Sequence, residues 1–191
     1  MFTGIITNLG RVARIEKDEY QFSVAEALCN KIALGSSISV NGVCLTVKEV
    51  LQDRRFSVDL MPETLKKTAL GSLQKSDEVN LELPATPSTF LSGHIVQGHV
   101  DGVGEIESIT KEGNSRLFRI NAPQNLTRYI IPKGSIAVNG ISLTVIGVED
   151  QGFSVGIIPY TWEHTMLHAA RVRSTVNIEV DVIAKYVEKF V

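Results

Sequence analysis

The sequence predicts an all-β protein made of two homologous modules, each a small closed barrel or a sandwich, and two observations support this. The first is a repeat: Val40–Val47 reads VNGVCLTV and Val138–Val145 reads VNGISLTV, so six of eight letters agree. The second is a series of short segments rich in Val, Ile and Thr, separated by Gly, Asn, Asp or Pro. Strands recurring every 8 to 12 residues, roughly, are typical of barrels and sandwiches, and closure removes the exposed edges.

Two further pairs of segments extend the repeat along the chain. They are Ser57–Leu70 with Ser154–Leu167, and Val79–Leu83 with Val176–Val180, each pair 97 residues apart. A weaker upstream match aligns Gly4 with Gly98 and Gly10 with Gly104. Matching blocks in the same order indicate duplicated units. The sequence therefore predicts modules at 1–90 and 91–183 and a C-terminal helix at 184–191.

The strands are predicted from β-branched residues flanked by turn formers. They are Ile38–Val47, Arg55–Leu60, Val79–Leu83, Gly104–Ile109, Leu117–Asn121, Ser135–Val145 and Phe153–Ile158. The dipeptides Asn41-Gly42 and Asn139-Gly140 are predicted turns, because Asn and Gly adopt positive φ at little cost.

Two short helical segments are predicted in each module. They are AEALCNKI with its counterpart PQNLTRYI, and PETLKKTAL with its counterpart PYTWEHTML. The latter pair opens on Pro62 and Pro159, and proline is favourable at the first helical position. The tail AKYVEKFV has an apolar stripe at helical spacing, formed by Tyr186, Val187, Phe190 and Val191, which requires a surface to cover it.

Composition excludes several classes of protein. The 191 residues are 43% hydrophobic and 21% charged with a formal net charge of −2, which lacks the basic excess of a nucleic-acid-binding protein. No apolar run reaches the roughly 18 to 20 residues of a membrane span, and the start at Met1 lacks signal-peptide character. The expectation is a cytoplasmic protein with no membrane or nucleic-acid partner. In that compartment Cys29 and Cys44 are expected to be free thiols.

Positions where the two copies differ in polarity are the candidates for function. Cys44 lies opposite Ser142, and Thr46 and Thr144 follow on the same strand face. Such a cluster of SH and OH groups suits recognition of a polar heterocycle. The alternative is structural, with Cys44 as a small buried hydrophobe and Ser142 as a turn former.

The segment Gly93–Gly102, GHIVQGHVDG, brings two histidines that the first copy lacks, and Ile5 lies opposite His99. A neutral imidazole can shuttle protons near pH 7, although a structural, hydrogen-bonded histidine is an equal alternative. His94 and His99 are five residues apart and fall on opposite faces of a strand, which argues against a metal site.

Two charged residues complete the candidates. Asp181 stands where the first copy has Pro84, and it either orients a histidine or caps the following helix. Lys133 stands opposite Gly35, with an exposed turn lysine as the alternative.

These segments resemble the riboflavin synthase family, which begins MFTGI, carries NGVCLTV and GISLTV, joins its halves through GHxVxGHVDG and closes on VNIEVDxIAKY. The resemblance covers essentially all of 1–191. It implies two tandem six-stranded antiparallel Greek-key barrels, each binding one lumazine. It also implies a homotrimer assembled by the C-terminal helices, with active sites between subunits, and lumazine synthase as a candidate partner.

The implied reaction is a dismutation without cofactor or metal. Two molecules of 6,7-dimethyl-8-ribityllumazine give riboflavin and 5-amino-6-ribitylamino-pyrimidinedione by transfer of a four-carbon unit. Two identical substrates in opposite roles need two similar but unequal sites, which a diverged duplication supplies.

The resemblance assigns residues to each site. Phe2, Cys44, Thr46, Met61 and Thr64 would line the first site, and Ser142, Thr144, Ile158, Thr161 and Lys133 the second. Thr3, Gly4 and Gly98 would also bind substrate, and His99 and Asp181 match catalytic positions. We hypothesise that His99 moves protons at the 7-methyl group, that Ser142 or a water it holds adds to C7 of the donor, and that Cys44 tunes the acceptor site.

Several letters depart from the family pattern. Ser76 and Arg173 replace a glycine, which predicts altered turns, while Asn139 replaces Asp and His168 replaces Gly. The short tail predicts a weaker trimer. The main alternative is a non-catalytic lumazine- or flavin-binding fluorescent antenna protein, whereas a flavin-dependent reductase would need a further nucleotide-binding domain.

Overall fold

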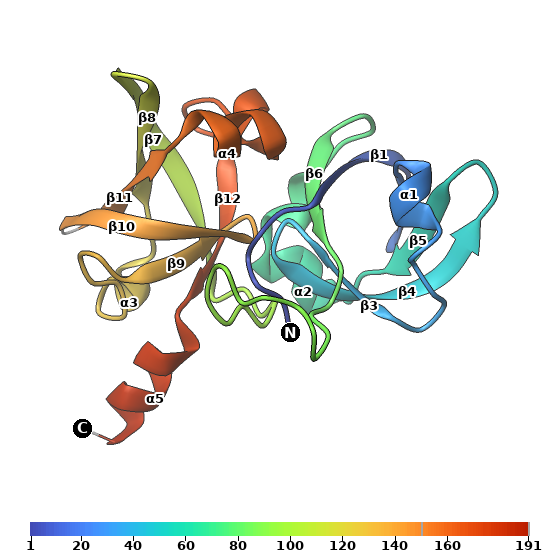
Figure 1. Ribbon diagram of the computed structural model, residues 1–191, viewed down its shortest axis with the longest axis horizontal. Helices are drawn as coiled ribbons and strands as arrows, with labels where there is room; N and C mark the ends of the chain where they lie inside the picture. Colours follow the sequence, from blue (N-terminus) through green and yellow to red (C-terminus); the bar gives the residue numbers. More distant parts are fainter. Residues whose placement is uncertain (150, 191) are drawn as a thin grey trace.

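The structure is a computed structural model that describes residues 1–149 and 151–190. It contains two closed six-stranded antiparallel barrels that lie side by side (Figure 1), which confirms the predicted fold. The first barrel consists of β1 (Asn8–Glu16), β2 (Glu19–Ser23), β3 (Ser37–Val40), β4 (Val43–Leu51), β5 (Arg55–Asp59) and β6 (Glu78–Glu82). The second consists of β7 (Gly102–Glu112), β8 (Ser115–Asn121), β9 (Ser135–Val138), β10 (Ile141–Glu149), β11 (Gly152–Ile157) and β12 (Thr175–Val180).

The two barrels share one strand order. In the first, the neighbours run β1-β2-β5-β4-β3-β6 and close, and the second repeats this order with β7 to β12. The predicted module boundaries at 90 and 183 fall after β6 and after β12, and they stay predictions.

The helices are short and follow the repeat. They are α1 (Glu26–Cys29), α2 (Pro62–Lys67), α3 (Gln124–Thr127), α4 (Pro159–His164) and α5 (Val182–Phe190), with 3₁₀ turns η1 (Ala69–Ser72) and η2 (Met166–Ala169). Thr68 and Thr165 end α2 and α4 in extended conformation, and their hydroxyls accept from the amides of Leu70 and Leu167. The predicted continuous helices therefore break into an α turn and a 3₁₀ turn.

The tail helix α5 projects away from both barrels (Figure 1). Tyr186, Val187 and Phe190 are exposed, so the predicted apolar stripe lacks a covering surface in the single chain. Val191, the last residue of that stripe, lies outside the described residues. None of the described helices combines the length and the apolar character needed to cross a membrane.

Each barrel has its own hydrophobic core, because strand side chains alternate between the two faces of the sheet. On β4, Val43, Leu45 and Val47 point into the first core, and the residues between them point outward. The corresponding strand β10 buries Ile141, Leu143 and Val145 in the second core. The candidate residues between these positions therefore lie on the outside of their barrels.

The two Asn-Gly turns meet where the barrels touch. Asn41 and Asn139 both have φ of +46°, and Gly42 and Gly140 have φ of +77° and +78°. A Cβ on Gly42 would lie 2.6 Å from the backbone nitrogen of Gly140. Each turn therefore has two roles, because it closes its hairpin and also lets the backbones of the two barrels approach each other.

Two further asparagines tie the barrels together in a reciprocal pattern. The Asn80 side chain donates to Asn139 O (2.9 Å) and accepts from Met166 N (2.7 Å). Asn177 repeats this by donating to Asn41 O (2.8 Å) and accepting from Ala69 N (2.7 Å). These buried amides are satisfied only when both barrels are present, which makes them determinants of the barrel arrangement.

Candidate functional site

The two residues that differ between the Leu-Thr-Val boxes are each covered by a glycine from another segment. Cys44 N donates to Gly98 O, and Ser142 N donates to Gly4 O, both at 2.8 Å. A Cβ on Gly98 or Gly4 would lie 2.6 Å from the Cβ of the residue beneath. Both glycines also have positive φ, +80° and +75°, so glycine is required there for two reasons.

The covering segments cross between the barrels. The N-terminal arm (residues 1–6) places Gly4 on the second barrel, and the segment 93–99 places Gly98 on the first. Phe2 and Val96 join the two segments through a reciprocal pair of backbone hydrogen bonds, 2.6 and 3.1 Å. Phe2 is fully buried beside Val96 and Ala137, with Cys44 packed against this cluster. Phe2 thus lies beneath the first site.

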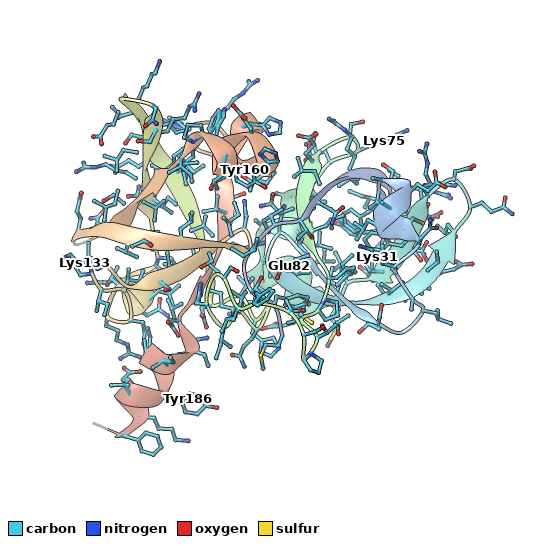
Figure 2. All side chains as sticks on the ribbon, viewed as in Figure 1. Lys31, Lys75, Glu82, Lys133, Tyr160 and Tyr186 are labelled. Carbon is cyan, nitrogen blue, oxygen red and sulfur yellow. The ribbon has the colours of Figure 1, made fainter. Side chains whose placement is uncertain are left out.

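Two buried carboxylates hold the covering segments. Glu82 accepts hydrogen bonds from Thr3 N and Oγ1, both 2.7 Å, and from Gly4 N at 3.0 Å. Figure 2 shows Glu82 near the junction of the barrels. Glu179 accepts from the amides of Gln97 (2.6 Å), Gly98 and His99 (both 2.9 Å).

Burial raises the pKa of the Glu82 and Glu179 carboxyls, while these hydrogen bonds act in the opposite direction. Sequence reasoning missed both residues. The available signal was a glutamate inside each of the matching apolar segments VNLEL and VNIEV.

The first candidate site is an outward face of the first barrel. Cys44 is half-buried under Gly98, while Thr46, two residues along β4, is exposed. The strand β5 pairs with β4 and leads into α2, which carries exposed Met61 just before its first residue and half-buried Thr64 in its first turn. The exposed His99 follows Gly98 directly. The grouping of these residues into one substrate site stays a prediction.

The second candidate site repeats this arrangement on the second barrel. Thr144 and Ile158 are exposed and Thr161 is half-buried, in positions equivalent to Thr46, Met61 and Thr64. Lys133 is an exposed turn residue with φ of +66°, and Figure 2 places it toward the outer end of this barrel. Its counterpart Gly35 has φ of +76°, so the turn geometry is retained with a lysine in a conformation that favours glycine.

His94, which sequence reasoning left without a role, touches Ser142. Its Nδ1 lies 2.7 Å from Ser142 Oγ, and its Nε2 is buried with no hydrogen-bond partner among the described residues. Burial lowers the pKa of His94, and the charge of Asp181 partly opposes this, so the imidazole is neutral near pH 7. Gly93 allows the contact, since a Cβ there would lie 2.9 Å from Ser142 Oγ.

Asp181 caps α5, which is the structural alternative that the sequence offered. Its Oδ1 accepts from Ile183 N at 3.0 Å. Lys185 of the same helix pairs with Asp101 at 2.7 Å, which fixes α5 at its base. The catalytic role of Asp181 stays a prediction.

The two histidines of the Gly93–Gly102 segment lie in different environments. His94 is buried against Ser142, and His99 is exposed beside the Cys44 site. Within residues 1–149 and 151–190, no three His, Cys, Asp or Glu side chains converge as a metal site. Cys29 and Cys44 are free thiols, as expected.

Comparison with known proteins identifies related chains. A family model described as the lumazine binding domain matches residues 3–84 and again 97–181. Riboflavin synthase of Actinobacillus pleuropneumoniae is 46% identical over 194 residues, covering 100% of this chain and 89% of that protein. The riboflavin synthase of Mycobacterium bovis is 46% identical, covering 99% and 97%, and that of Bacillus subtilis is 39% identical, covering 100% and 89%.

Solved structures with this fold include complexes of LumP. LumP bound to riboflavin matches with a TM-score of 0.86 at 24% identity, covering 94% of this chain and 99% of that chain. LumP bound to 6,7-dimethyl-8-(1'-D-ribityl) lumazine matches with a TM-score of 0.84. At that identity the structural match establishes the fold alone. The full-length identity and the doubled domain match show that this chain belongs to the riboflavin synthase family.

Proposed function

We propose that this chain is a riboflavin synthase that converts two molecules of 6,7-dimethyl-8-ribityllumazine into riboflavin and 5-amino-6-ribitylamino-pyrimidinedione. The observation that carries the proposal is the pair of equivalent but chemically unequal sites. Cys44 lies under Gly98 with His99 next to it, and Ser142 lies under Gly4 with His94 against it. One molecule donates its four-carbon unit and the other receives it, so the reaction needs two such sites and no external oxidant.

The proposed division of roles places the donor at Ser142 and the acceptor at Cys44. The Ser142 hydroxyl is hydrogen-bonded to a neutral imidazole, which can accept its proton as the hydroxyl, or a water it holds, adds to C7 of the donor ring. His99 carries an accessible imidazole at the acceptor side, suited to proton transfer at the 7-methyl group. Those methyl protons are already acidic because the ring delocalises the anion.

Holding the two rings in a reactive stack supplies a further part of the rate enhancement. Correct orientation alone can remove several kcal/mol, roughly 7 to 11 in the best model systems, from a barrier of this kind. Thr46 and Met61 in the first site, and Thr144 and Ile158 in the second, are exposed in the single chain. Each site therefore has an open side onto which a second site can be placed.

We propose a homotrimer in which the first barrel of one subunit faces the second barrel of its neighbour. The open sites and the exposed apolar side chains of α5 support this assembly, because both would be covered by it. Sedimentation velocity tests it, with a trimer expected and a monomer at all concentrations contradicting it. Association with lumazine synthase is tested by co-sedimentation of the two proteins.

The decisive experiment supplies the purified chain with 6,7-dimethyl-8-ribityllumazine as sole substrate. Riboflavin absorbance should grow in step with loss of lumazine, at one riboflavin for two lumazines. A stable, brightly emitting complex with no riboflavin would instead identify an antenna protein. A chain carrying both Cys44→Ala and Ser142→Ala is the matched control, because it keeps the barrels and alters both sites.

A further inference from the structure

A glycine of the N-terminal arm links a glutamate of the first barrel to a serine of the second. Gly4 N donates to Oε2 of Glu82 on β6 at 3.0 Å, and Gly4 O accepts from Ser142 N on β10 at 2.8 Å. Glu82 also accepts from Thr3, whose carbonyl oxygen accepts from His94 N at 3.2 Å. Glu82 therefore holds both the cover of Ser142 and the segment that carries the histidine in contact with it.

A second connection runs in the opposite direction, from the second barrel to the first. Gly98 N donates to Oε2 of Glu179 on β12 at 2.9 Å, and Gly98 O accepts from Cys44 N on β4 at 2.8 Å. His99 N donates to the same carboxylate oxygen, also at 2.9 Å. Glu179 therefore holds both the cover of Cys44 and the backbone of His99.

Both glutamates are buried, Glu82 with 5% and Glu179 with 3% of its surface exposed. A buried carboxylate is costly unless it is hydrogen-bonded, and here three donors from a covering segment meet each one. Hydrogen bonds to an ionised group are roughly twice as strong as those between neutral groups. Lifting a cover would remove these donors from its glutamate, so each carboxylate stabilises the closed position of its cover.

We infer that Glu82 and Glu179 are positioning residues, each of which fixes the site on the opposite barrel. Glu82 acts on Ser142 through Gly4, and Glu179 acts on Cys44 through Gly98. Each site is then complete only when the last strand of the other barrel is in place. The consequence for turnover rests on the proposed function, whereas closure of the covers is a property of the chain without substrate.

Residue-resolved amide hydrogen exchange tests this crossed dependence, because Cys44 N–H reports one cover and Ser142 N–H the other. In Glu179→Gln the exchange of Cys44 N–H should accelerate about ten-fold, the effect of losing a hydrogen bond to a charged group. Ser142 N–H should change by no more than about two-fold, as expected for a distant site. Glu82→Gln should give the reverse pattern.

The matched control is Glu78→Gln, which makes the same change on β6 at a glutamate that pairs with Arg11. Neither reporter amide should respond to it.

Thr3→Val is a milder variant that keeps Glu82 and removes one of its three hydrogen bonds. It should accelerate exchange of Ser142 N–H about two- to five-fold, the effect of losing one ordinary hydrogen bond, and leave Cys44 N–H unchanged. Exchange that accelerates equally at both amides in the glutamate variants, or at neither amide, overturns the inference.

Turnover provides a second measurement, because the proposed reaction uses both sites at once. Glu82→Gln and Glu179→Gln should each lower kcat about ten-fold or more with less effect on lumazine affinity, since displaced reacting groups are slow to react. Crossed exchange with unchanged kcat would also overturn the positioning role. An unaltered chain that makes no riboflavin refutes the proposed function instead, and the exchange pattern then decides alone whether the covers are held from the opposite barrel.

Discussion

The two barrels share their framework and differ in the side chains placed on its outer face. Strand order, the Asn-Gly turns, the reciprocal asparagines, the buried glutamates and the covering glycines all occur twice. Their differences include the covered position, Cys44 or Ser142, and the nearby histidine, the exposed His99 or the buried His94. The duplicated halves keep the residues that join them and differ at the positions proposed to bind substrate.

Replacement of His99 tests whether the exposed histidine next to Gly98 takes part in the reaction. His99→Gln is expected to lower turnover about 10²- to 10⁴-fold, the usual contribution of an acid–base group, with little change in lumazine affinity. Steady-state rates and fluorescence titration separate the two effects. His164→Gln, another exposed histidine, should leave both unchanged, and retention of full turnover by His99→Gln refutes the assignment.

The shared framework can be broken at the turn where the barrels meet. Gly42→Ala should lower the free energy of unfolding by about 2 to 4 kcal/mol, because the left-handed conformation and the contact with the Gly140 backbone both oppose a Cβ. Gly35→Ala is the matched control, since Gly35 has φ of +76° and no atom within 4 Å of the added Cβ. It should cost only the conformational part, about 1 to 2 kcal/mol. Equal losses in urea denaturation would contradict the role of the turn contact.

The buried histidine of the second site gives a pH test. Because burial lowers the pKa of His94, the unfolded chain binds the proton more readily, and stability falls as pH drops below the unfolded value of about 6.5. Between pH 7 and pH 5.5, His94→Gln should lose less stability than the unaltered chain, by up to about 1.4 kcal/mol. Identical pH profiles of urea midpoints for the two chains would show that His94 is not buried as described.

Two turns at equivalent places in the barrels should have a small effect on the free energy of unfolding. Ser76 and Arg173 have φ of +78° and +72°, where glycine is preferred. Ser76→Gly and Arg173→Gly should each raise the free energy of unfolding by about 0.5 to 1 kcal/mol, since relief of the left-handed strain exceeds the entropy cost of glycine. Thermal or urea unfolding measures this, and a loss of stability in either variant would show that its side chain stabilises the turn.

Much of the fold could be predicted because short stretches of sequence determine its strands, turns and helix starts. Alternation, the Asn-Gly turns and the repeat located the barrels, and prolines located α2 and α4. The strands β1 and β2 were not identified individually, since Asn8–Glu16 and Glu19–Ser23 mix charged and apolar residues, and the weaker upstream repeat match reached only β1. The altered turns expected at Ser76 and Arg173 keep a glycine-like backbone, because neighbouring strand pairing fixes their φ.

The sites were less predictable because they are assembled from distant segments. The residues on β4 and β10 could be found by comparing the copies. The contact of His94 with Ser142 and the hydrogen bonds from the amides of residues 97–99 to Glu179 join positions more than 45 residues apart. Hydrophobic periodicity does not indicate which distant residues pair. Glu82 and Glu179 were overlooked because they match in the two copies, and matching residues were interpreted as framework.

The N-terminal arm crosses to the second barrel, and this affects any attempt to separate the two halves of the chain. Cutting the chain in the connection after β6 would strip the cover from Ser142, because Gly4 would leave with the first fragment, and would deprive Cys44 of Gly98. Separately produced halves should therefore regain both covers only when mixed, and a bulky fusion placed ahead of Met1 should disturb the pocket of the distal half more than that of the half to which it is attached.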